Sequence, residues 1–82
     1  MYELISVTRS ELKINASFYK TKEEAQKAMI EDIMLMTDYK NFNEIQKDAA
    51  DGLCGYYDDE AWVITNQFGT AQWNIVEIPA TL

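Results

Sequence analysis

The sequence predicts an α+β fold, in which a four-stranded antiparallel sheet of ββααββ order carries one long and one short helix packed on one face. Two observations predict it. Apolar and polar residues alternate near both ends of the chain, as they do in strands, while apolar residues recur at helical spacing in the middle. Strands on both sides of a helical region favour a sheet with helices on one side. The chain has 82 residues, so we expect a single small domain, residues 1–82.

Two strands are predicted at the start of the chain, over residues 2–9 and 12–19. The second has the cleanest alternation, and its two faces are Leu12, Ile14, Ala16 and Phe18 against Lys13, Asn15, Ser17 and Tyr19. A period of two residues is typical of a half-buried strand. With a turn at residues 9–11, the two strands are expected to form an antiparallel hairpin.

Two helices are predicted next. Thr21 and Glu24 fit a capping box at the start of the first helix, which continues to about residue 38. The apolar stripe of this helix consists of Ala25, Met29, Ile33 and Met36. Asn41 is the expected N-cap of a short second helix that ends near Gly52.

Residues 51–59 are predicted to be a loop, and strands over residues 60–66 and 71–78 close the chain. Gly69 is expected to take the left-handed position of the hairpin between these strands, and Pro79 to end the last one. Trp62 and Trp73 fall on the two strands and could be cross-strand neighbours.

The composition excludes most catalytic chemistry. The chain carries 14 acidic against 7 basic residues, no histidine and one cysteine, Cys54, and its net charge is −7. Without histidine, or a second cysteine to hold a metal, we expect no enzyme activity, no cofactor and no metal site. The negative charge disfavours nucleic acids and anionic membranes. A lone cysteine, no transmembrane segment and no visible signal peptide predict a cytoplasmic protein.

Two features are candidates for binding a protein. The densest aromatic–acidic stretch, residues 56–60, lacks the spacing of a calcium loop, and so short a chain offers no cleft for paired catalytic carboxylates. It could dock a basic partner or be a solvated loop. A tryptophan on the open face of the sheet, with Tyr2 or Tyr19, would make that face a binding surface. The candidate partner-binding residues are Met34, Tyr56, Tyr57, Asp58, Asp59, Glu60, Trp62 and Trp73.

Three segments resemble a pattern in small acidic bacterial proteins, often carried by mobile elements: Phe18–Ala25, the Ala61-Trp62 pair and the Trp73–Ile78 strand. The resemblance implies no activity, ligand or catalytic residue. It raises the idea of a phage or mobile-element inhibitor of a defence nuclease that mimics DNA with its carboxylates.

We therefore predict a non-enzymatic protein-interaction module with a basic protein partner. The DNA mimic is one alternative. The other is a structural homo-oligomer, in which a second copy buries the open sheet face or an unpaired edge strand.

Overall fold

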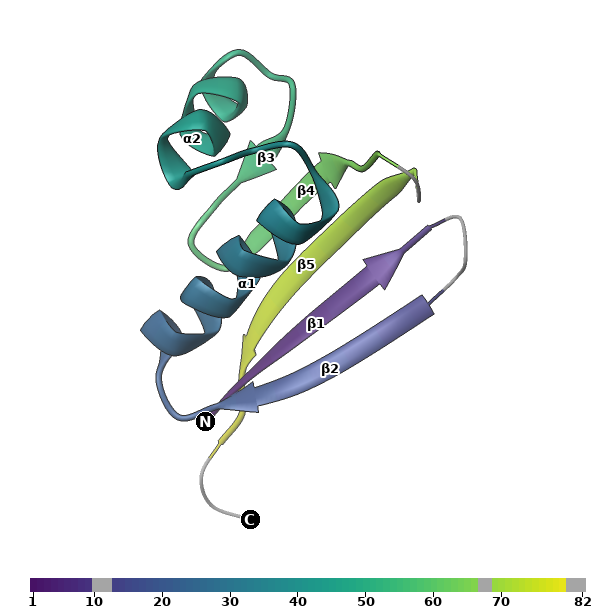
Figure 1. The fold of residues 1–82 in the computed structure, drawn as a ribbon. Coiled ribbons are helices and arrows are strands. Elements are labelled where there is room, and N and C mark those ends of the chain that lie inside the picture. Colours follow the sequence, from purple (N-terminus) through teal and green to yellow (C-terminus); the bar gives the residue numbers. More distant parts are fainter. Residues whose placement is uncertain (10–12, 67–68, 80–82) are drawn as a thin grey trace.

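The computed structural model describes residues 1–9, 13–66 and 69–79 and confirms an α+β fold with an antiparallel sheet and two helices (Figure 1). Its elements are β1 (Tyr2–Thr8), β2 (Lys13–Tyr19), α1 (Lys22–Met36), α2 (Phe42–Ala50), β3 (Gly55–Tyr56), β4 (Glu60–Ile64) and β5 (Thr70–Glu77). The predicted four strands and ββααββ order are wrong. The sheet has five strands in the spatial order β2-β1-β5-β4-β3, and the chain order is ββααβββ.

The fifth strand, β3, lies within the predicted loop of residues 51–59. Gly55 and Tyr56 pair antiparallel with Trp62 and Ala61 of β4. Two residues are too few to leave a periodic pattern in the sequence. The indole of Trp62 occupies the space where a side chain at Gly55 would project, so the glycine lets this ring lie against β3.

Both predicted hairpin pairings are present. β1 pairs antiparallel with β2 along seven residues, and β4 pairs antiparallel with β5. Gly69 has a φ of +68°, as predicted for the second hairpin. β1 also pairs with β5, which joins the two ends of the chain in one sheet. The remaining predicted turn residues at 10–11 and 67–68, with Leu12, lie outside the described residues.

The helices begin where their capping residues predict. The Thr21 hydroxyl accepts a 3.2 Å hydrogen bond from the Glu24 backbone N–H, and the Asn41 side chain accepts one of 3.1 Å from the Glu44 N–H. The Glu44 carboxylate also accepts a 2.6 Å hydrogen bond from the Lys40 N–H. These bonds satisfy backbone donors that have no partner within a helix.

The core lies between the helices and one face of the sheet (Figure 1). Its largest fully buried side chains are Trp73, Met29, Ile33, Ile45 and Val63. Three of the four residues of the predicted helix stripe are buried, and Met36 packs against them from the edge of the core. The helix stripe and the inner face of the central strands therefore hold the fold together.

The structure corrects two expectations about the sheet. Trp73 pairs with Ala61 and Trp62 with Gln72, so the tryptophans lie on opposite faces and are not cross-strand neighbours. The second strand is not half-buried, because β2 is an edge of the sheet and its apolar residues point to the face that the helices do not cover. Ile14 and Phe18 on its apolar face are 68% and 57% exposed.

Candidate docking surface on the open sheet face

The sheet face that the helices leave uncovered, here called the open face, follows from the alternation along each strand and the register between strands. The buried residues of β1, β5 and β4 point toward the helices, so their neighbours point the other way. The open face consists of Glu3, Ile5 and Val7 of β1, Ile14, Ala16 and Phe18 of β2, Thr70, Gln72, Asn74 and Val76 of β5, and Glu60, Trp62 and Ile64 of β4.

Large apolar side chains gather on the open face. The exposed ones are Ile14, Phe18, Trp62, Ile64 and Val76, with exposed fractions between 37% and 69%. Ile5 and Val7 are half-buried and lie beside Ala16 and Ile14 across the β1–β2 ladder. Single exposed apolar residues are common on protein surfaces, but a group on one sheet face is typical of an interaction surface.

Trp62 is the predicted aromatic site residue that lies on this face. Its ring rests against Gly55, and 37% of its surface is exposed. An aromatic ring held in one position suits a binding anchor, because little side-chain entropy is lost when a partner covers it. Tyr2 and Tyr19, the predicted companions of an exposed tryptophan, pack against the core on the other side of the sheet.

The predicted acidic segment forms an ordered turn, residues 57–60, here called the acidic turn. Its backbone is held at three points. The Tyr57 N–H donates to the Glu60 carbonyl at 2.8 Å, the Ile75 N–H donates to the Asp59 carbonyl at 2.7 Å, and the Gln26 amide donates to the Asp58 carbonyl at 2.8 Å. All four side chains of the turn are exposed, and Glu60 is on the open face. The carboxylates therefore stand on a fixed backbone at one end of this face.

The other predicted site residues lie toward the core. Trp73 has no exposed surface for a partner to contact, and Met34 is partly buried against the core. Tyr56 packs edge-on against Phe42, with ring centroids 5.0 Å apart. Burial and, secondarily, the charge of Asp58 raise the pKa of Tyr56. We therefore place these three residues in the packing of the domain and not on its docking surface.

Asp32 on α1 faces the buried indole of Trp73. Among the described residues, the Trp73 Nε1–H makes no hydrogen bond of standard geometry, although the Asp32 carboxylate attracts it. Burial raises the pKa of Asp32 above its ordinary value of 3.8; the indole N–H opposes the shift and the charge of Glu31 adds to it. The ionised form of Asp32 is therefore less favourable in the folded chain than in the unfolded one.

This raised pKa predicts a pH dependence of stability. The folded chain holds the Asp32 proton more tightly than the unfolded chain does, and this difference stabilises the fold. The contribution is complete below pH 3.8 and is lost as the pH rises through the raised pKa of Asp32. Asp32→Asn is expected to remove this pH dependence. It should also raise the free energy of unfolding at pH 7, because the substituted side chain carries no charge that burial disfavours. Urea denaturation between pH 3 and pH 8 measures it. The control Asp59→Asn, at an exposed position, should change stability at pH 7 by less than about 0.5 kcal/mol.

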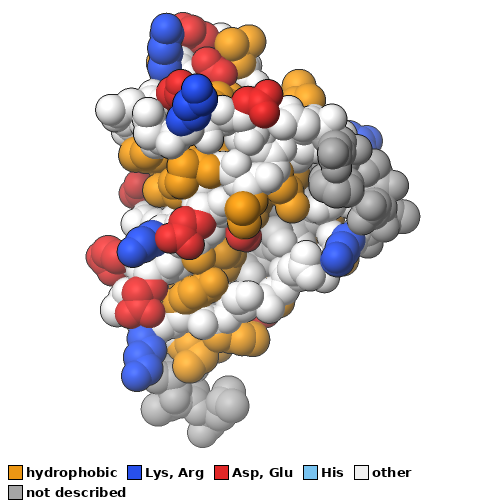
Figure 2. All heavy atoms as spheres, viewed as in Figure 1, with side chains coloured by type: hydrophobic (Ala, Val, Ile, Leu, Met, Phe, Trp, Pro, Cys, Tyr) orange, Lys and Arg blue, Asp and Glu red, His pale blue; other side chains and the backbone are white. Residues whose placement is uncertain are grey.

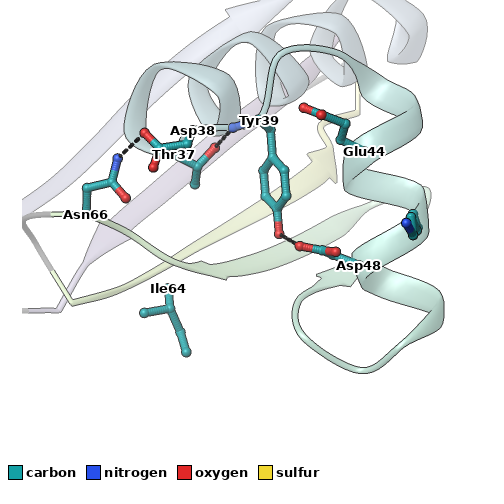
Figure 3. Close-up of a pocket in the computed structure, with 8 residues that line it drawn as sticks. Thr37, Asp38, Tyr39, Glu44, Asp48, Ile64 and Asn66 are labelled. Carbon is teal, nitrogen blue, oxygen red and sulfur yellow. Dashed lines mark hydrogen bonds between the residues drawn. The ribbon is translucent and has the colours of Figure 1, made fainter.

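A polar hollow of about 450 Å³ lies between the α1–α2 connection, α2 and the end of β4 (Figure 3). Its lining residues are Thr37, Asp38, Tyr39, Glu44, Lys47, Asp48, Ile64 and Asn66. Its polar groups bond mainly to one another: the Tyr39 hydroxyl donates to Asp48 at 2.6 Å, and the Asn66 amide donates to Asp38 at 2.9 Å. No local pattern in the sequence predicts this cluster, which joins residues up to 28 positions apart. The bonds tie the α1–α2 connection to α2 and to the end of β4.

Tyr39→Phe tests this assignment of the hollow. Burial, followed by the hydrogen bonds to Asp48 and Cys54, raises the pKa of Tyr39, so the phenol keeps its proton and stays a donor. Losing the bond to Asp48 is expected to lower the free energy of unfolding by about 1 kcal/mol, measured by urea denaturation. Tyr57→Phe, at an exposed position, is the matched control and should have a much smaller effect. Equal effects of the two substitutions would contradict the structural role of the bond.

The described residues contain little else that suggests chemistry. Cys54 is buried, and its thiol contacts the Ile45 carbonyl oxygen at 3.6 Å. Over residues 1–9, 13–66 and 69–79, no three Cys, Asp or Glu side chains are placed to hold a metal ion together. In the same ranges, neither helix is long and apolar enough to cross a membrane.

No protein-family model, curated protein or solved structure matches this chain. The resemblance to small acidic bacterial proteins therefore remains an expectation. Function has to be inferred from the chain's own surface, on which the open face is the most distinctive feature.

Proposed function

We propose that the chain is a non-enzymatic protein-interaction module that binds another protein through the open face. The observation that supports this is the set of five large apolar side chains left exposed on one side of the sheet. Covering a fully exposed side chain of this size contributes about 1.5–3 kcal/mol. Even partial burial of several such side chains supplies a substantial driving force for association.

The acidic turn supports the second part of the prediction, a basic partner. Asp58 and Asp59 are exposed beside the end of the open face, and Glu60 lies on it. Polar groups at the rim of an interface select partners and speed association more than they add affinity. We therefore propose that the turn favours partners with Lys or Arg at the corresponding rim, and that this contribution weakens with salt.

The charge pattern on the helix-covered side supports an interaction module better than a DNA mimic. A mimic requires carboxylates in rows with phosphate-like spacing. Figure 2 shows the helix-covered side, where acidic, basic and apolar side chains are interspersed. Even distribution of charge over a surface is a common device for keeping proteins apart in solution.

The test is capture of partners by the tagged chain at low and high salt, with three variants. Ile14→Lys adds a charge to the open face, and Leu35→Lys adds the same charge at an 83% exposed position on α1. We expect a partner that binds the wild type and Leu35→Lys at high salt but not Ile14→Lys. Asp58→Asn with Asp59→Asn should lose only partners captured at low salt. Identical capture by all chains would contradict the proposal.

A further inference from the structure

We propose that the occupant of the open face is a second copy of this chain, in a two-fold symmetric dimer with the two open faces packed together. This inference rests on the proposed binding through the open face and names the partner of that face; it does not use the preference of the acidic turn for basic groups. A face-to-face arrangement of twisted sheets is a standard way to bury two apolar faces. It is also the arrangement that the charges on this face favour.

The central argument is the pattern of open-face residues along β1. These are Glu3, Ile5 and Val7, and the alternation continues to Arg9, whose N–H donates to the Thr70 carbonyl at 3.0 Å and so extends the β1–β5 ladder. Consider a two-fold axis that lies between the two sheets, runs perpendicular to β1 and passes over this strand at the level of Ser6. It places Glu3 opposite Arg9 of the second copy and Ile5 opposite Val7, and it does so twice.

Glu3 and Arg9 cannot form this pair within one chain. They lie at opposite ends of one strand, about 20 Å apart at the usual rise per residue. On β1 an acid and a base flank a pair of apolar residues. Two copies of this strand complement each other only when they run antiparallel, because the acid of each then meets the base of the other. The pattern therefore distinguishes a second copy from an arbitrary partner.

The same axis gives compatible contacts on the neighbouring strands. From the register, Ile14 of β2 meets Ala16 of the second copy, and Gln72 of β5 meets Asn74. Glu60 of β4 meets Trp62 and not another carboxylate. Each chain has a net charge of −7, so association needs an interface in which no like charges meet. This packing satisfies that condition at each of these positions.

The area of the face predicts a weak dimer. Four strands spaced about 4.8 Å apart, with an average length of about 23 Å, give a footprint of roughly 450 Å² per copy and roughly 900 Å² in total. Side-chain relief increases the accessible area above this flat projection. Stable interfaces bury about 1,200–2,000 Å², so the area of the dimer lies at or below the low end of this range. We therefore expect a dissociation constant in the micromolar range.

The experiment is sedimentation equilibrium of the full chain over a wide range of concentrations that reaches the high micromolar. The mass should rise from 9.5 kDa toward twice that value. Glu3→Arg and Arg9→Glu should each weaken the dimer at least tenfold, and the double variant should recover most of the loss. Ile64→Glu, on β4 and far from the β2 edge, should also weaken it, because the axis places residue 64 opposite the acidic turn of the second copy. Leu35→Glu, outside the open face, should not. Circular dichroism confirms that each variant is folded.

Two results would overturn the inference. A wild-type chain that stays monomeric at every concentration excludes the second copy as occupant; capture that still depends on Ile14 would then keep the interaction module with a foreign partner. A dimer that resists Ile64→Glu and both single charge reversals would instead be paired through the exposed edge of β2, and the open face would not be its interface.

Discussion

Trp73→Ala is expected to lower the free energy of unfolding by about 3–5 kcal/mol. Trp73 is the largest fully buried side chain, and it lies on β5, the central strand of the five. Its removal leaves a cavity between the sheet and the helices that the surrounding side chains fill only in part. A domain of this size has a total stability of roughly 4–12 kcal/mol, so the variant is expected to be marginally folded.

Urea denaturation followed by circular dichroism measures this effect. Trp73→Phe keeps most of the buried volume, so its free energy of unfolding can be measured if the alanine variant does not fold. Trp62→Ala is the matched control, because it removes the same side chain from a position that is 37% exposed. A loss from Trp62→Ala as large as that from Trp73→Ala would mean that the two tryptophans do not differ in burial as described.

Local signals in the sequence were sufficient for every element except β3. The capping residues Thr21 and Asn41 mark the helix starts, and Gly69 marks a hairpin, because each acts on backbone groups within a few residues. β3 has no such local signal. It depends on the contact between Gly55 and Trp62, which only the folded sheet brings together.

The alternation in β2 predicted a strand correctly but its burial wrongly. A period of two shows that one face of a strand is apolar; it does not show what covers that face. In this chain the helices cover the opposite face of the sheet, and Phe18 stays exposed. The mismatch between an apolar pattern and an uncovered face is the basis of the dimer that we propose.

The candidate site depended on register, which the sequence alone does not determine. Trp73 lies opposite Ala61, and a shift of one residue would place Trp62 and Trp73 on the same face. The order of the acidic turn likewise depends on Gln26, a residue of α1 that is 32 positions from its partner Asp58. Tertiary contacts of this kind decide which of the predicted binding residues are presented at the surface.

Gly55→Ala is expected to lower the free energy of unfolding by about 1–3 kcal/mol. A Cβ atom at Gly55 would overlap Nε1 and Cδ1 of the Trp62 indole, so the ring has to leave the surface of β3. Trp62 then loses its packing, and β3 loses the side chain that covers it. Acrylamide quenching of tryptophan fluorescence should increase, because Trp73 remains buried while Trp62 becomes more accessible.

The contact itself is tested by a double-mutant cycle. In a Trp62→Ala background no ring is displaced, so Gly55→Ala should have little effect on stability there. An unchanged effect in that background would show that the strain arises elsewhere in β3. The substitution also reports on function, because it displaces the aromatic anchor of the open face without removing it. We therefore expect Gly55→Ala to weaken self-association of the chain, whereas Leu35→Lys leaves it intact.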